Sequence, residues 1–165
     1  MKVKYMAMTG IMAAMITIMT AYVCHVPVGM NGGYIHFGDA VIYLAAVLLP
    51  KPYAIAAAAI GGGLADLFTA PVWVPATVLI KTLLVLPFET KGVKIITKRN
   101  VMSTIIAYFI SGFGYYAAEK ILFEEGAVFA VTMGQTLIQS LGSAVVFILL
   151  GFAMDKAHVK NRFMS

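Results

Sequence analysis

Three charged side chains within apolar segments are the residues best suited to chemistry. Asp39 opens one apolar stretch, directly after His36-Phe37-Gly38. Asp66 lies late in a second stretch, and Lys81 lies in a third, four residues after Thr77. Because ionisable groups are costly in hydrocarbon, such residues are candidates for binding sites or ion pathways. Their chemistry is charge pairing and hydrogen bonding.

Each of these charges also has a purely structural interpretation. An ion pair between Asp66 and Lys81 would lower the cost of burying both groups. Asp39 would cap exposed N–H groups at a helix start and favour the positive end of the helix dipole. The alternative is that these groups line a polar pocket, and both interpretations stay open at this point.

Amide and aromatic side chains occur near the same positions. Gln135 and Gln139 are four residues apart and lie on one face of an expected helix, where their amides need partners in protein or ligand. Trp73 and Tyr116 fit either a ring-stacking role or an aromatic belt at the lipid headgroups.

Several other chemistries lack their motifs. The run Gly61-Gly62-Gly63 continues as Leu64-Ala65-Asp66, without the Gly-Lys-Ser/Thr ending of a phosphate-binding loop. Cys24 is the single cysteine, and the three histidines lack metal-ligand spacing. The basic residues sit at the ends of apolar segments rather than in a stripe for nucleic acid. We therefore expect no catalytic residues, no metal site, no cofactor and no enzymatic activity.

Composition indicates the environment that must position these groups. The chain has 165 residues, of which 61% are hydrophobic and 12% charged, against roughly 45–50% and 25% in soluble domains. We expect a single transmembrane domain over residues 1–165, all-α, with six transmembrane helices. The second is too short for the roughly 20 residues that a straight crossing needs. The expected segments are 5–23, 37–49, 53–68, 74–88, 101–123 and 127–154.

The basic residues test this layout, since cytoplasmic loops carry the Lys and Arg excess. One side of the expected bundle holds ten of the twelve basic residues, the other side holds Lys120, and Lys81 lies within the fourth segment. This asymmetry predicts a multi-pass protein with six crossings and both termini in the cytoplasm. The ten are Lys2, Lys4, Lys51, Lys91, Lys94, Lys98, Arg99, Lys156, Lys160 and Arg162.

The first segment carries a stripe of small or hydroxyl residues. A cleaved signal peptide is an alternative for this segment, but no small-x-small cleavage site precedes His25. A stripe of this kind lets another helix approach closely. Packing within the chain and docking to a partner subunit are both open. The stripe consists of Ala7, Gly10, Ala14, Thr17 and Ala21.

Five motifs together point to a known family. They are 33–40 (GYIHFGDA) with a short helix after it, 61–66 (GGGLAD), 75–81 (PATVLIK), 114–119 (GYYAAE) and 135–139 (QTLIQ). With these motifs the sequence resembles the S component, the substrate-binding membrane subunit, of energy-coupling-factor (ECF) vitamin transporters. The resemblance covers nearly the whole chain. It departs at Gly10 and Ala14, where the family commonly has paired alanines, and at Thr136, where the family often has Asn.

The resemblance implies an S-component-like bundle in the cell membrane of a prokaryote, which captures a vitamin or vitamin precursor from outside. It also implies partners: a coupling transmembrane subunit and two ATPase subunits that drive uptake. The motifs are nearest to the branch associated with riboflavin, pyridoxine-like and hydroxymethylpyrimidine compounds. The stripe residues Ala7, Gly10, Ala14 and Thr17 would then dock on the coupling subunit. The candidates for substrate binding include the polar residues named above. The full set is Asn31, Tyr34, His36, Asp39, Asp66, Trp73, Thr77, Lys81, Tyr115, Glu119, Gln135 and Gln139.

Two other classes of function compete with this interpretation. In a self-sufficient secondary carrier or small channel, Asp66 and Lys81 would act as a proton- or ion-coupled pair, although no inverted internal repeat is visible in the sequence. In a structural membrane subunit, the polar residues would only stabilise helix packing.

Overall fold

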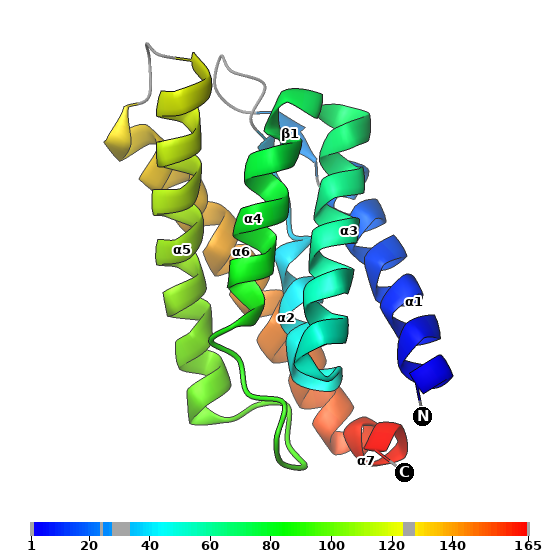
Figure 1. The fold of residues 1–165 in the computed structure, drawn as a ribbon. Coiled ribbons are helices and arrows are strands. Elements are labelled where there is room, and N and C mark those ends of the chain that lie inside the picture. The colour runs from blue at the N-terminus through cyan, green and yellow to red at the C-terminus, as the bar shows by residue number, and fades with distance from the viewer. Residues whose placement is uncertain (1, 24, 28–33, 124–127, 165) are drawn as a thin grey trace.

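The computed structural model describes residues 2–23, 25–27, 34–123 and 128–164, and these form a helical bundle with one small sheet (Figure 1). Two short strands pair antiparallel, with Val26 opposite Ile35. The elements in chain order are α1 (Lys2–Ala21), β1 (Val26–Pro27), β2 (Tyr34–Ile35), α2 (Asp39–Leu48), α3 (Lys51–Thr69), the 3₁₀ helix η1 (Pro71–Trp73), α4 (Val74–Val85), α5 (Lys98–Phe123), α6 (Phe129–Lys156) and α7 (Val159–Met164).

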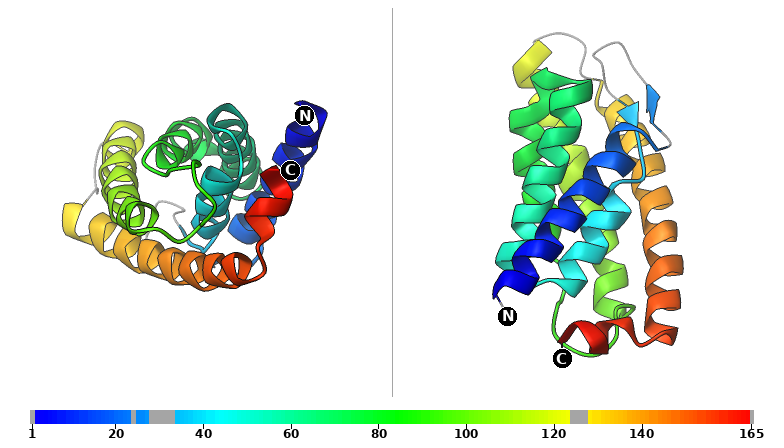
Figure 2. Two further views of the ribbon diagram at one scale, coloured as in Figure 1. Left: turned by 90° about the horizontal axis from the view of Figure 1, so that it is seen from below. Right: turned by 90° about the vertical axis from the view of Figure 1, so that its right-hand side faces the viewer.

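The short helix α2 lies inside the bundle. Every residue from Asp39 to Leu48 is buried, which fits a segment that is apolar around its whole circumference. The longer helices follow one another around it in the order α1, α3, α4, α5, α6 (Figure 2). Helix α2 contacts α1, α3, α4 and α6, so it forms the core onto which these four helices pack.

Four helices are long and apolar enough to cross a membrane, namely α1, α3, α5 and α6, while α2 and the η1–α4 segment are shorter apolar helices. Ten residues of α2 rise only about 15 Å, half of a hydrocarbon layer of about 30 Å. Large apolar side chains such as Ile11, Phe109 and Leu149 are exposed on the bundle surface, as lipid contact requires. The prediction of an all-α membrane protein with a short second helix is confirmed.

The chain termini lie at the same end of the bundle (Figure 1). We call this the terminal end, and we call the opposite end, which carries β1, β2 and η1, the hairpin end. An even number of passes between the two ends accounts for this placement, as the sequence layout predicted.

The sequence missed some local structure. Between the first and second expected segments the structure has the strands β1 and β2. After the sixth expected segment it has a further helix, α7. Two-residue strands and a six-residue helix are too short to produce a periodic pattern in the sequence.

Helices α1 and α3 pack closely because small residues meet at their crossing. A Cβ atom added at Gly61 would lie 2.7 Å from the backbone oxygen of Ala13 and from Cβ of Ile16. The Thr17 hydroxyl donates hydrogen bonds of 3.0 Å to the backbone oxygens of Gly61 and Ala13. Glycine at 61 is therefore required for this approach.

Candidate functional site

A buried ion pair lies between α2 and α4 towards the hairpin end. The Nζ atom of Lys81 lies 2.6 Å from Oδ1 of Asp39. The second carboxylate oxygen of Asp39 accepts a 3.0 Å hydrogen bond from Nε2 of Gln139 on α6. Three helices that are distant in sequence thus meet at one carboxylate.

This pairing corrects two expectations for the charged residues. Lys81 was expected to pair with Asp66, but its contact within 4 Å is Asp39, because the start of α2 faces α4 inside the bundle. Asp39 was also considered as a helix cap, but the N-cap position is Gly38 and the helix start has no side-chain cap. The Asp39 carboxylate is instead used in contacts between helices.

Asp66 on α3 belongs to a neighbouring hydrogen-bonded group. Its Oδ1 atom accepts a hydrogen bond from the hydroxyl of Tyr34 on β2. That hydroxyl also accepts one from Thr69, at 3.3 Å. Burial, and secondarily the Asp66 charge, raises the pKa of Tyr34 well above its ordinary value, so the phenol stays protonated and acts as a donor to Asp66.

His36, in the loop before α2, connects these two groups. Its Nδ1 accepts a hydrogen bond from the backbone N–H of Gly38 at 3.0 Å, and the backbone N–H of His36 donates to Oε1 of Gln139 at 3.4 Å. Burial, aided by the nearby Lys81 charge, lowers the pKa of His36 to about 3. The imidazole is therefore neutral near pH 7, with its Nδ1 lone pair in use.

Aromatic rings and hydroxyls cover the ion pair on the α4–α5 side. Lys81 Nζ lies 5.4 Å from the ring centroid of Tyr115, within cation–π range. The Tyr115 and Thr77 hydroxyl oxygens are 3.2 Å apart. Trp73 packs edge-on to Tyr115 at 6.0 Å between centroids and on Phe123 at 5.5 Å.

Most of the candidate substrate-binding residues therefore gather in one place, which we call the polar cluster. The Glu119 carboxylate accepts a hydrogen bond from Thr132 on α6 at 2.8 Å. Gln135 is half-buried, one turn along α6 from Gln139. Asn31 lies outside the described residues. The polar cluster consists of Tyr34, His36, Asp39, Asp66, Trp73, Thr77, Lys81, Tyr115 and Gln139.

Sequence reasoning missed three residues that support the cluster. Thr69 donates to the Tyr34 hydroxyl, Phe123 packs on Trp73, and His25 stacks on Tyr34 with centroids 4.0 Å apart. Thr69 and Phe123 end their helices in apolar surroundings, where nothing in the sequence marks them. His25 was noted only as lacking metal-ligand spacing. Among the described residues, no group of three or more His, Cys, Asp or Glu side chains could hold a metal ion.

The small-residue stripe of α1 divides into two parts. Ala7, Gly10 and Ala14 are exposed, and a Cβ atom at Gly10 would meet nothing within 4 Å. Thr17 and Ala21 are buried, and Thr17 is bonded to α3. The exposed part of the stripe is therefore the terminal half of α1, and Thr17 takes part in packing within the chain.

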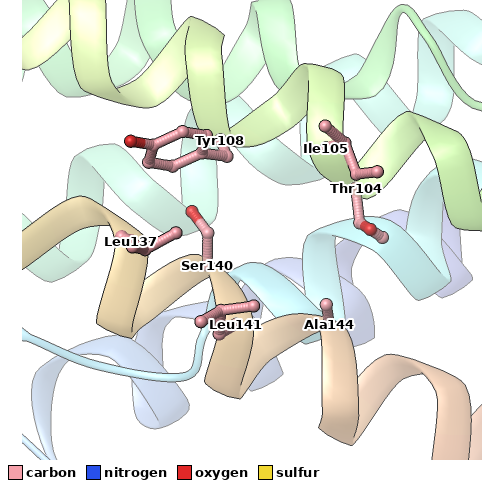
Figure 3. A pocket seen from close by; sticks show the side chains of 7 residues that line it. All are labelled: Thr104, Ile105, Tyr108, Leu137, Ser140, Leu141 and Ala144. Atoms are coloured by element: carbon pink, nitrogen blue, oxygen red, sulfur yellow. The ribbon is translucent and has the colours of Figure 1, made fainter. Parts of the chain in front are cut away.

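A shallow apolar groove between α5 and α6 lies apart from the polar cluster (Figure 3). None of the candidate substrate-binding residues lines it. Its lining is Thr104, Ile105, Tyr108, Leu137, Ser140, Leu141 and Ala144.

Comparison with known proteins gives three findings. The family model described as "ECF-type riboflavin transporter, S component" matches residues 1–156. A Pyrococcus woesei protein described as "Uncharacterized protein in gap 3'region" is 26% identical over 139 residues, covering 83% of this chain and 93% of that protein. The solved structure described as "Structure and mechanism of the S component of a bacterial ECF transporter" superposes with a TM-score of 0.75 at 17% identity, covering 94% of this chain and 98% of that one.

Proposed function

This chain belongs to the family of S components of ECF-type riboflavin transporters, and we propose that it binds a water-soluble vitamin or vitamin precursor outside the cell for ATP-driven uptake by partner subunits. The observation that carries this proposal is the polar cluster. Charged, amide, phenol and imidazole groups from β2, α2, α3, α4, α5 and α6 converge towards the hairpin end of an apolar bundle.

Such a cluster costs stability if it serves packing alone. Replacing a buried ion pair by well-packed apolar side chains is often neutral or stabilising, and in a membrane-spanning bundle ionisable groups mark functional sites. The cluster offers carboxylate and hydroxyl acceptors, an ammonium and an amide donor, and aromatic rings beside them. A ring compound with several polar substituents matches this set.

The exposed terminal half of the α1 stripe supplies a surface for a partner. Ala7, Gly10 and Ala14 present little side chain on a lipid-facing helix, which lets a second helix approach closely. We propose that the coupling transmembrane subunit docks there, with two ATPase subunits behind it. The ATPases supply the energy, since this chain carries no phosphate-binding loop.

The distribution of basic residues supports the orientation. The terminal end carries most of the Lys and Arg residues, which favours placing that end and both termini in the cytoplasm. The hairpin end, with the polar cluster, then faces the outside of the cell membrane, where a scarce nutrient must be captured.

Co-expression tests the assignment. The chain is produced with the coupling and ATPase subunits of a prokaryotic ECF module, purified through a tag on the coupling subunit, and reconstituted into liposomes containing ATP. We expect this chain to co-purify with the coupling subunit. We also expect the liposomes to take up, in an ATP-dependent way, the small molecule that is bound to the purified chain. Uptake by this chain alone, driven by an ion gradient, would instead indicate a self-sufficient secondary carrier. If the chain neither associates with the coupling subunit nor supports uptake, the transport proposal is contradicted.

A further inference from the structure

Two carboxylates and one ammonium group are buried together in the polar cluster. Asp39, Asp66 and Lys81 are 0%, 4% and 1% exposed. Lys81 is held at 2.6 Å by Asp39 and interacts electrostatically with Asp66 as well. A single positive charge is therefore shared between two negative charges.

The other groups around Asp66 do not neutralise this excess of negative charge. Tyr34 donates a neutral hydroxyl to its carboxylate. His36, one element away, has a pKa of about 3 because it is buried, so it adds no positive charge at neutral pH. The His25 ring stacks on the Tyr34 ring, and its Nδ1 atom lies 3.2 Å from the backbone oxygen of Thr20. Within the described residues, Asp66 has no cation of its own.

The wider charge pattern at the hairpin end has the same sign. The described carboxylates at this end are those of Asp39, Asp66 and Glu119, and the described amines are those of Lys81 and Lys120. Lys120 is exposed and lies 5.7 Å from the ring centroid of Tyr116 rather than in the cluster. A surplus of negative charge in a low-dielectric site attracts cations and disfavours anions.

The aromatic groups of the cluster suit the same kind of ligand. Tyr115 already presents its ring to the ammonium of Lys81. Trp73 packs against Tyr115, and Tyr34 lies at the Asp66 carboxylate. Electron-rich ring faces next to a carboxylate bind cationic groups, and Trp binds them better than Tyr or Phe does.

We infer that the substrate of this chain is a small heteroaromatic cation, whose protonated amine or amidine-like N–H groups pair with Asp66 and whose ring lies against Trp73 and Tyr115. This inference rests on the proposed function and narrows its substrate class. A phosphate or carboxylate substituent would face Asp66 with like charge. A neutral ligand would leave the surplus charge buried without a partner, which is costly.

Three compounds with one ring test this directly. Pyridoxamine, pyridoxine and 4-pyridoxate share a pyridine ring and differ by a cationic, neutral or anionic group at one position; riboflavin serves as a larger neutral reference. Trp73 is the single tryptophan of the chain, so its fluorescence reports on the cluster in purified protein, with calorimetry as the second readout. We expect pyridoxamine to bind at least about 10-fold more tightly than pyridoxine, and 4-pyridoxate to bind weakest.

A charge-neutral variant tests the assignment to Asp66. Asp66→Asn keeps the side-chain shape and removes the charge, and it is expected to reduce the pyridoxamine-to-pyridoxine affinity ratio to near one, chiefly by weakening pyridoxamine binding. Glu89→Gln is the matched control, because that carboxylate is on the terminal end and pairs with Arg99; its ratio is expected to equal that of the wild type. A thermal melt checks that each variant is folded.

The outcomes separate this inference from the proposed function. Equal or tighter binding of pyridoxine, 4-pyridoxate or riboflavin, or no pyridoxamine binding at millimolar concentration, overturns the cation inference. An unchanged ratio in Asp66→Asn overturns the role of Asp66. The wild-type comparison depends on no variant. The proposed function stands or falls separately, on association with the coupling subunit and ATP-dependent uptake.

Discussion

Nζ of Lys81 lies 2.6 Å from Oδ1 of Asp39, and both side chains are buried. The two residues are 42 positions apart, one on α4 and one at the start of α2. The pair ties the short central helix to the bundle wall at the depth where the polar cluster forms. It therefore links the stability of the fold to the geometry of the candidate site.

Removing one charge of this pair is expected to destabilise the protein strongly. Asp39→Asn leaves the Lys81 ammonium buried without its carboxylate, and breaking a buried pair in this way costs roughly 3–5 kcal/mol. Thermal or denaturant unfolding in detergent measures the loss. The double variant Asp39→Asn/Lys81→Met is expected to recover a large part of it, since no unpaired charge remains.

The exposed pair of Arg99 and Glu89 is the control for that experiment. Its side chains are 65% and 30% exposed, and Glu89→Gln is expected to change the free energy of unfolding by less than about 1 kcal/mol. The losses of unfolding free energy in Asp39→Asn and in Lys81→Met are then compared with the loss in the double variant. If the two single losses add up to the double one, the pair is not coupled.

Packing between α1 and α3 predicts a strong effect at one glycine. Gly61→Ala would place a methyl group 2.7 Å from a backbone oxygen of α1, so the helices must separate, at a cost of about 1–3 kcal/mol. Gly134→Ala on α6 is the control, because a Cβ atom there meets nothing within 4 Å. The melting temperature is expected to fall in Gly61→Ala and not in Gly134→Ala. A Gly61→Ala variant that melts at the wild-type temperature would show that α1 and α3 tolerate a wider spacing.

His36 predicts a pH dependence of stability. Its pKa falls to about 3 in the folded protein because the ring is buried, whereas an unfolded chain has a value of about 6.5. Between these values the unfolded state binds the extra proton, so the free energy of unfolding decreases as the pH falls below about 6.5, by up to about 1.4 kcal/mol per pH unit. His36→Asn is expected to flatten this part of the stability curve.

The exposed His158 is the control for this titration. His158→Asn should leave the slope between pH 6.5 and pH 4 unchanged. A wild-type protein whose stability is flat over that interval would show that His36 accepts a proton without unfolding the loop.

The exposed α1 stripe predicts separate effects on transport and binding. Ala14→Leu places a bulky side chain where close helix approach is proposed, so uptake with the coupling subunits is expected to be lost while ligand affinity stays within about twofold. Ala117→Leu, at an exposed alanine of α5, is the control and should transport normally. An equal loss of binding and uptake in Ala14→Leu would count against a docking role.

The sequence predicted the membrane class and the short second helix because both follow from composition and segment length. It also marked Asp39, Asp66, Lys81 and Gln139, since polar groups within apolar segments stand out. It paired Lys81 with Asp66, which was wrong, because the structure pairs Lys81 with Asp39. The rotation of α2 relative to α4, which brings Asp39 to Lys81, leaves no trace in periodicity.

The α1 stripe shows a similar limit. A 3-4-3-4 spacing averages 3.5 residues per turn, so the stripe turns slowly around a straight helix of 3.6 residues per turn. Over the seven residues from Gly10 to Thr17 this drift is only about 20°, which is too little to explain why Gly10 is exposed while Thr17 faces α3. The path of α1 across α3 determines which part of the stripe is exposed and which part is buried against α3.

Native mass spectrometry of the detergent-purified protein, followed by extraction and identification of any bound small molecule, tests the central claim most directly. The proposed function predicts one small molecule per wild-type chain, still present in Ala14→Leu and lost when the cluster is altered at Gln139→Ala. A wild-type protein that stays empty after growth in rich medium, or a bound molecule that survives the change at Gln139 with unchanged occupancy, would contradict the polar cluster as the substrate-binding site.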